Sequence, residues 1–393
     1  MAWTTPIRFG IAGLGTAGLA FIPPIKANPA WHLAAVAEPD ADVRAALAAQ
    51  HGAAGYPDLD AMLAHPGLDA VIIATPTPLH AAQARAAFAA GKHVVLEKPM
   101  ATDLAAALAI VEAAEAAGLV LLIGHSHSFD QPIQAMHQLI AGGTLGRVRM
   151  IHTWCFSDWI YRPRRPDELE VATGGGVTLR QGAHQFDIIR LLGGGALRSI
   201  KAHTFDWDPA RRAIGAHTAN LEFADGAVAT AVYNGYGGLA TSELTAGITE
   251  WGFTEPVTVP SKRVAPADVA QAKRRRADAS DKSAAPFQPH FGLTVVSCEG
   301  GDIRQSPTGL IVYSAAGRQE IDLPAGQIPH ALLLAEFHDA VRGIRPALHD
   351  GRWGLANLEA CLAAIQSAET GEAVMLQHQF MLPPRPISAT AKP

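Results

Sequence analysis

The chain has 393 residues, which is enough for two or three domains of about 100–200 residues each. Hydrophobic residues make up 49% and charged residues 17%, a balance typical of a soluble globular enzyme and not of a disordered chain. A net charge of −5 argues against a nucleic-acid-binding protein, and three dispersed cysteines argue against a disulfide framework or a cysteine zinc site.

Neither the N-terminal residues nor the apolar runs of the sequence indicate secretion or a membrane. Residues 1–10 lack a charged segment followed by an apolar core of signal-peptide length. No apolar run reaches the ~20 residues that span a bilayer, and Glu112 and Glu115 interrupt the most apolar stretch. We therefore expect a cytoplasmic protein with reduced thiols and no membrane partner.

The first 124 residues alternate short β-branched runs with alanine-rich stretches. This alternation predicts βαβ units and a parallel sheet, and the mostly apolar strands are typical of a sheet that helices cover on both faces. We expect Pro23 and Pro24 to break the first helix. The predicted strands span 7–12, 33–37, 70–74, 93–96 and 120–123, and the predicted helices span 17–28, 42–50, 80–90 and 104–117.

After residue 124 the strands become longer and partly alternating, which predicts an α+β domain with a large open, mostly antiparallel sheet. We expect residues 125–382 to bind substrate and form oligomers. Residues 257–288, which carry a basic run, are interpreted as an inserted solvated loop, and 383–393 as a proline-rich tail. The predicted strands span 147–155, 200–205, 218–223 and 227–234, and the predicted helices span 133–141, 183–192, 331–341 and 354–370.

The first predicted strand runs directly into Gly13-Leu14-Gly15-Thr16-Ala17-Gly18, which opens a predicted helix. A G-x-G-x-x-G string between a strand and a helix is typical of a Rossmann dinucleotide site. Gly13 permits the tight turn, Gly15 lets the backbone approach a pyrophosphate, and Gly18 lets the helix pack on the strand. The helix N-terminus, with Thr16 and Ala17, offers N–H groups to the phosphates.

Glu38 follows the second predicted strand, 20 residues after Gly18. A Rossmann domain places there the carboxylate that binds the ribose 2′-hydroxyl, and a carboxylate repels a 2′-phosphate. The sequence therefore predicts NAD in preference to NADP. Asp40 is an alternative carboxylate, and Arg44 is close enough in sequence to weaken the discrimination.

Two more segments directly follow strands, namely Thr75-Pro76-Thr77-Pro78-Leu79-His80 and Glu97-Lys98-Pro99. With the glycine loop they resemble the Gfo/Idh/MocA oxidoreductase family, and the likeness extends to residues 330–359. It implies that Thr75, Pro76, His80 and Glu97 lie at the cofactor and that Lys98 lies beside the nicotinamide and the substrate. A lysine buried there could relay a proton. The alternative is a surface lysine paired with Glu97.

The family's other motif is a glycine run followed by Asp and, four residues later, His; here residues 174–187 read GGGVTLRQGAHQFD. His184 matches the family's catalytic histidine, although it could also be a histidine packed between helices. Arg180 stands where sugar and polyol dehydrogenases usually have Asp. On one helix, positions 180 and 184 would share a face. Because Arg only donates and suits a carboxylate, we expect an anionic substrate.

Other residues favour a flat, carboxylated ring as the substrate. Trp159 and Arg162 belong to the aromatic and arginine-rich run at 159–166, and His125 and His127 stand where relatives more often have Asn and Arg. The arginines of that run could instead be solvated loop charges. The strings GHSHSFD and WIYRPRRPDEL resemble the family's phthalate 4,5-cis-dihydrodiol dehydrogenases. That resemblance implies oxidation of a carboxylated cis-dihydrodiol to a catechol with NAD.

In that reaction either Lys98 or His184 would be the base, and Arg180 would hold a ring carboxylate. The alternatives are a sugar or polyol dehydrogenase, a non-catalytic NAD-binding regulator and an NAD-dependent hydrolase. Arg180 argues against the first, and Lys98 with His184 against the second. We expect no metal, because the histidines show no ligand spacing. The expected partners are a small anionic substrate and copies of the same chain, in a dimer or tetramer.

Overall fold

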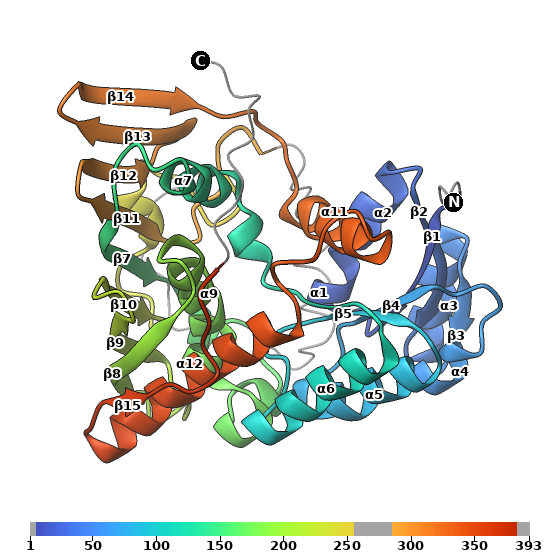
Figure 1. The fold of residues 1–393 in the computed structure, drawn as a ribbon. Coiled ribbons are helices and arrows are strands. Elements are labelled where there is room, and N and C mark those ends of the chain that lie inside the picture. Colours follow the sequence, from blue (N-terminus) through green and yellow to red (C-terminus); the bar gives the residue numbers. More distant parts are fainter. Residues whose placement is uncertain (1–4, 255–284, 383–393) are drawn as a thin grey trace.

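The structure, a computed structural model, describes residues 5–254 and 285–382. The first of its two sheets is parallel, with strand order β3-β2-β1-β4-β5-β6, and it confirms the predicted Rossmann domain (Figure 1). Its strands are β1 (Ile7–Ala12), β2 (Trp31–Ala37), β3 (Ala54–Tyr56), β4 (Ala70–Ile73), β5 (His93–Leu96) and β6 (Leu121–Ile123). β3 was not predicted, because three residues give no pattern.

Helices cover both faces of this sheet. Successive residues of β4 join different cores: Ile72 packs with α2 (Ile22–Ala27) and α11 (Pro329–Val341), whereas Val71 packs with α5 (His80–Ala89) and α6 (Leu104–Ala117). This explains why the strands are apolar throughout. Helix α11 comes from late in the chain, and its Phe337 ring lies 5.8 Å from that of Phe9. Helices α3 (Ala41–His51) and α4 (Leu59–Leu63) complete this domain.

The helix predicted over 17–28 is two helices, α1 (Thr16–Leu19) and α2. We expected Pro23 and Pro24 to break the predicted helix, but the break lies before them. They lie in the first turn of α2, where a missing N–H removes no helical hydrogen bond, and the break precedes them at Ala20 and Phe21.

The second sheet has nine strands in the order β14-β13-β12-β11-β7-β10-β9-β8-β15. β7 and β10 are parallel and the other pairs are antiparallel, which confirms the predicted fold class. The strands are β7 (Val148–Phe156), β8 (Leu197–Phe205), β9 (Ala216–Phe223), β10 (Val228–Asn234), β11 (Leu293–Cys298), β12 (Gly301–Gln305), β13 (Gly309–Ser314), β14 (Gly317–Asp322) and β15 (Val374–Met375). Strands β11 to β15 were not predicted.

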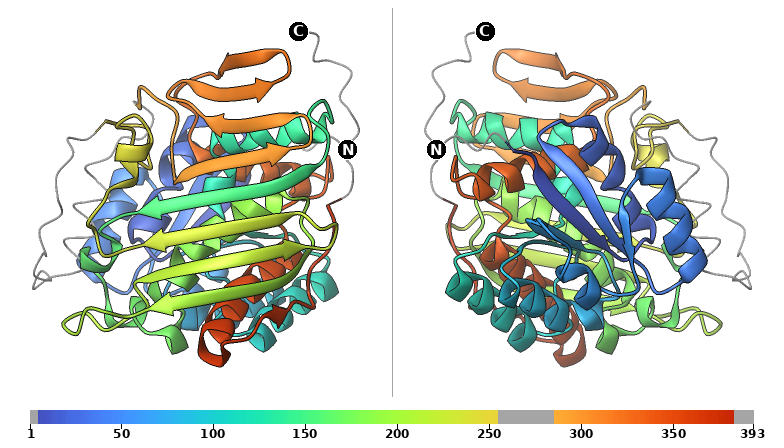
Figure 2. Two further views of the ribbon diagram at one scale, coloured as in Figure 1. Left: turned by 90° about the vertical axis from the view of Figure 1, so that its left-hand side faces the viewer. Right: turned by 90° about the vertical axis from the view of Figure 1, so that its right-hand side faces the viewer.

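One face of this sheet packs on helices, and no helix covers the other in Figure 2 (left). The helices on the covered side are α7 (Gln131–Ala141), α8 (Gly176–Arg180), α9 (Gly182–Leu192) and α12 (Gly351–Thr370). Helix α12 contacts α6 of the first domain and α9 and β8 of the second. It therefore joins the two domains.

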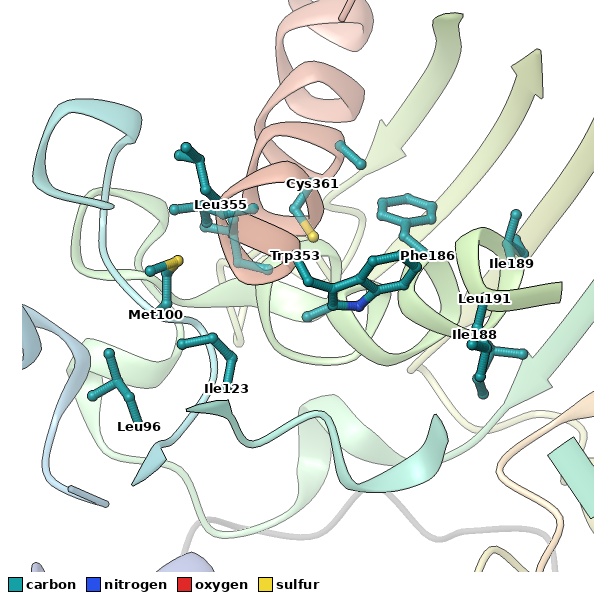
Figure 3. Close-up of a cluster of buried hydrophobic side chains, with 14 of the residues drawn as sticks. Leu96, Met100, Ile123, Phe186, Ile188, Ile189, Leu191, Trp353, Leu355 and Cys361 are labelled. Atoms are coloured by element: carbon teal, nitrogen blue, oxygen red, sulfur yellow. The ribbon is translucent and has the colours of Figure 1, made fainter. Parts of the chain in front are cut away.

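Trp353, near the start of α12, is fully buried and points toward Phe186 of α9 (Figure 3). Its indole N–H donates to the buried Asp187 carboxylate at 2.5 Å, and the Arg190 guanidinium lies 3.9 Å from its ring centroid. The interior at the domain junction thus combines apolar packing with a buried polar network.

The inserted loop predicted over 257–288 lies largely outside the described residues, and the tail at 383–393 lies wholly outside them. Within the described parts of the chain, no helix is long and apolar enough to cross a membrane.

Candidate active site

A cavity of about 710 Å³ lies between the carboxyl ends of the first sheet and the second domain. Ligands bind in this position in open α/β sheets. The glycine loop and Glu38 line one end, and Lys98 and His184 line the other. Among the other residues that line it are Thr16, Ala17, Thr75, Pro76, Glu97, His127, Arg162, Arg164, Arg165, Glu168, Arg180, Glu250, Trp251 and His330.

The glycine loop has the space that a pyrophosphate requires. Gly13 adopts φ +88°, and a Cβ there would lie 2.6 Å from the Ala74 carbonyl oxygen. A Cβ on Gly15 would meet no atom within 4 Å, so a bound group can approach its backbone closely. Gly18 lies behind the loop and packs against Gly13. The loop therefore fits a dinucleotide.

Glu38 lines the cavity at the end of β2. Its carboxylate accepts hydrogen bonds from the backbone N–H of Leu14 (3.2 Å) and of Asp40 (3.4 Å). Arg44 donates to the backbone carbonyls of Glu38 (2.6 Å) and Pro39 (3.2 Å). This arrangement places a carboxylate, and not a guanidinium, where ribose hydroxyls would bind.

Lys98 follows β5 and its Nζ donates to the backbone carbonyl of Arg180 at 2.8 Å. Burial, reinforced by the Arg180 guanidinium, lowers its pKa from 10.5 to about 8. A lysine with this pKa can hold or release a proton close to neutral pH.

His80, expected at the cofactor, is buried and does not line the cavity. Its Nδ1 lies 2.9 Å from the Pro99 carbonyl oxygen and its Nε2 lies 2.9 Å from that of Thr75. It therefore joins the two loops that follow β4 and β5, one of which carries Lys98.

Arg180 and His184 do not share a helix, contrary to expectation. Arg180 ends α8, Gln181 is the residue between the two helices, and His184 belongs to α9. Both side chains still line the cavity. Burial, followed by the Lys98 charge, lowers the pKa of His184 well below 6.5, so its imidazole is neutral. Its buried Nδ1 has no hydrogen-bond partner among the described residues.

His127 lies between two carboxylates that favour its charged form. Its Nδ1 lies 2.9 Å from Asp130 and its Nε2 lies 3.2 Å from Glu250. Burial opposes the charge, but the two carboxylates prevail and raise its pKa to about 9. Its ring centroid is 4.7 Å from that of His184.

His125, by contrast, is buried outside the cavity lining, and burial lowers its pKa to about 4. Its Nε2 lies 3.5 Å from the Asn357 amide nitrogen. The structure thus separates the two histidines that the sequence placed together.

Several arginines gather at the Lys98 end. The Nε of Arg162 donates to Asp158 at 2.7 Å, and the guanidinium of Arg164 lies 4.1 Å from the Trp159 ring centroid. Arg164 and Arg180 approach the same oxygen of the buried Glu168, at 3.8 and 3.4 Å. Trp159 lies behind the cavity and supports Arg164.

Sequence reasoning missed Glu168, Glu250 and Trp251. Glu168 follows the arginine-rich run, so the mixture of arginines with Asp167 and Glu168 could have indicated local ion pairs. Glu250 and Trp251 lie outside every motif, and no pattern marked them. Within residues 5–254 and 285–382, no group of three or more His, Cys, Asp or Glu side chains is placed to hold a metal ion.

Comparison with known proteins matches both domains. Residues 7–125 match the oxidoreductase family with an NAD-binding Rossmann fold, Gfo/Idh/MocA, and residues 133–238 match a C-terminal domain of that family. The chain is 33% identical, over 92% of its length and 95% of the relative, to 1-carboxy-3-chloro-3,4-dihydroxycyclohexa-1,5-diene dehydrogenase of Comamonas testosteroni. It is also 30% identical to inositol 2-dehydrogenase of Leifsonia xyli subsp. xyli, over 51% of this chain and 58% of that protein.

A solved dehydrogenase structure from Bordetella bronchiseptica RB50 has a TM-score of 0.89 and 34% identity, covering 94% of this chain and all of that one (100%). The two family matches agree with the NAD-type glycine loop of the first domain. The solved structure agrees with the arrangement of the two sheets. The chain belongs to the Gfo/Idh/MocA family of NAD-binding oxidoreductases.

Proposed function

We propose that this enzyme oxidises a carboxylated cis-dihydrodiol to the corresponding catechol, with NAD as the hydride acceptor. The observation that carries this proposal is the group of cationic side chains at the Lys98 end of the cavity. That end is lined by Lys98, His127, Arg162, Arg164, Arg165 and Arg180, against the carboxylates of Glu97, Glu168 and Glu250.

The carboxylates that balance several of these charges lie behind the cavity surface. Asp130 binds His127, Asp158 binds Arg162 and Asp167 binds Arg165, and none of these three aspartates lines the cavity. The surface presented to a ligand is therefore more positive than the region as a whole. Such a surface favours a carboxylate over a neutral sugar.

We assign the substrate carboxylate to Arg180. Its backbone carbonyl holds Lys98 Nζ and its guanidinium faces the cavity beside Glu168. A fork of donors binds a carboxylate with two parallel hydrogen bonds. A substrate held there has its ring next to Lys98.

Lys98 is the proposed base. A pKa of about 8 leaves part of the Lys98 population neutral near pH 7, whereas burial and the Lys98 charge lower the pKa of His184 well below 6.5 and make it the weaker base. Bound NAD supplies the hydride acceptor. Lys98 takes the hydroxyl proton as the carbinol carbon loses its hydride. The resulting ketone then tautomerises to the catechol: the neighbouring carbinol carbon loses its proton, and the carbonyl oxygen gains one. In this proposal His184 orients the hydroxyl group.

The Comamonas relative supports this proposal, because its name describes a carboxylated dihydroxycyclohexadiene as substrate. The inositol dehydrogenases among the relatives define the competing outcome, a neutral polyol as substrate.

The test is turnover of NAD with carboxylated cis-dihydrodiols, inositols and aldoses, followed by NADH absorbance, with the aromatic product identified by mass spectrometry. We expect NADH and catechol in equal amounts from a carboxylated dihydrodiol. Turnover of inositols or aldoses without turnover of any dihydrodiol would overturn the proposal.

A further inference from the structure

The loop of residues 206–215, between β8 and β9, contacts the segment that carries Trp159 and Arg162. Arg211 makes two of these contacts: its Nε donates to the Ile160 carbonyl oxygen and its Nη2 donates to that of Arg162, both at 3.0 Å. A single guanidinium thus bridges two backbone carbonyls on either side of Tyr161.

Asp208 makes a third contact, with the side chain of Tyr161. The Tyr161 hydroxyl donates to Asp208 Oδ2 at 2.7 Å, and both residues are buried. The other carboxylate oxygen accepts from the backbone N–H of Ala210 at 2.9 Å, which fixes the turn that precedes Arg211. Burial and this hydrogen bond raise the pKa of Tyr161 to about 12, so the hydroxyl remains a donor.

The same loop holds the segment that carries Arg180. The Ile214 carbonyl oxygen accepts from the backbone N–H of Val177, in the first turn of α8, at 2.7 Å. Gly176 adopts φ +83°, and a Cβ there would lie 3.3 Å from the Ile214 Cβ. The loop therefore contacts α8 closely, and α8 ends at Arg180.

We propose that residues 206–215 form a positioning loop that sets the distance between Arg162 and Arg180 and so determines which carboxylated ring fits beside Lys98. This inference rests on the proposed function for the nature of the ligand. Arg162 lies on an irregular segment, between the 3-10 turn at 159–161 and Pro163, which cannot fix its own position as a long helix or strand would. An anion site needs its donors held to a fraction of an ångström.

The experiment compares Arg211→Ala with Arg212→Ala as a matched control. Arg212 is the neighbouring arginine, is 71% exposed and pairs with Asp206 within the loop. Hydrogen exchange of peptides spanning 158–165 reports the position of the segment and needs no ligand. Titration with phthalate reports the anion site, and steady-state kinetics separate KM from kcat.

For Arg211→Ala we expect faster exchange at 158–165. We also expect a rise of about tenfold in the Kd for phthalate and in the KM for the dihydrodiol. The variant loses the two hydrogen bonds from Arg211 that hold the segment of Arg162 in position. In the same variant, kcat and the KM for NAD should each change by less than about twofold. Arg212→Ala should match the wild type. Equal exchange and equal phthalate affinity in the two variants would overturn the inference.

A second pair of variants guards against loss of folding. Asp208→Asn keeps one acceptor oxygen for Tyr161 but loses the acceptor for the Ala210 N–H, so it should lie between the wild type and Arg211→Ala, whereas Asp208→Ala, which loses both, should resemble Arg211→Ala. Equal behaviour of the Asn and Ala variants would contradict the role of this hydrogen bond. If wild-type protein oxidises no dihydrodiol, the proposed function fails, while exchange and phthalate binding still decide on the loop.

Discussion

At the scale of single residues, Lys98 controls the pH dependence that we expect. A base must be unprotonated, and the pKa of Lys98 is about 8, so kcat/KM for the dihydrodiol should rise about tenfold per pH unit below pH 8 and level off above it. Lys98→Met should reduce kcat by about 100-fold or more, the contribution of a positioned base. A pH-independent kcat/KM between pH 6 and 9 would favour neutral His184 as the base.

We expect Arg180 to contribute both to substrate binding and to the electrostatics around Lys98. Arg180→Ala should raise the KM for a carboxylated substrate by about tenfold to a hundredfold, since a hydrogen-bonded charge is lost. Removing its charge also removes one cause of the low Lys98 pKa, so the rising limb of the pH profile should move to higher pH. Arg180→Lys, which keeps the charge but loses the fork, should restore the pH profile more than the KM. Unchanged KM and pH profile in Arg180→Ala would exclude Arg180 from the site.

The sequence indicated the residues that follow strands better than those that support them. The sequence indicates the glycine loop, Glu38 and Lys98 as site residues because each follows a strand, and parallel strands all end at one edge of the sheet. We expected three further residues to contact the cofactor or the substrate, but they are buried outside the cavity lining: His80, His125 and Trp159. Sequence patterns identify a residue as part of a motif without showing which way its side chain points.

At the scale of helices and strands, the strands missed in the second sheet include both the apolar β13 (GLIVYS) and the polar β14. β14 (Gly317–Asp322) reads GRQEID and is exposed along most of its length, so neither burial nor alternation marks it. It is a strand because β13 pairs with it residue by residue. The break between α8 and α9 also depends on packing, since Gly182 lies against His217 of β9.

Helix α12 should contribute strongly to stability through Trp353. Trp353→Ala removes a fully buried indole, the donor to Asp187 and the ring beneath Arg190, so unfolding free energy should fall by about 3–5 kcal/mol. Trp353→Phe keeps most of the packing but loses the N–H, and it should cost less. Denaturant unfolding followed by circular dichroism measures both. A midpoint for the Ala variant equal to that of the wild type would contradict this view of the domain junction.

At the scale of the whole molecule, the two domains meet at the cavity, and each supplies half of the site. The first domain provides the glycine loop, Glu38 and Lys98, and the second provides Arg180 and His184. α11 and α12 tie the domains together, because α11 packs on the first sheet and α12 contacts both domains. The cationic end of the cavity therefore depends on the two domains keeping a fixed position relative to each other.

The uncovered face of the second sheet supports a homo-oligomer, which we propose without assigning the number of subunits. Met150, Trp154 and Val228 on this face are 43, 43 and 44% exposed. Trp154→Lys combined with Met150→Lys should lower the mass measured by light scattering, because charges would oppose burial of the face. Ile344→Lys, at a 66% exposed apolar site in another part of the surface, is the control. A mass unchanged by the double substitution would place any subunit contact elsewhere.

The central claim is that the cationic end of the cavity selects a carboxylated dihydrodiol. The most direct measurement compares kcat/KM, with NAD, for a carboxylated cis-dihydrodiol and for the same ring with hydrogen in place of the carboxylate. The account predicts that the carboxylated ring reacts about tenfold to a hundredfold more efficiently, the value of one charged hydrogen-bonded contact. Equal efficiency for the two rings, or more efficient oxidation of an inositol than of either, would contradict it.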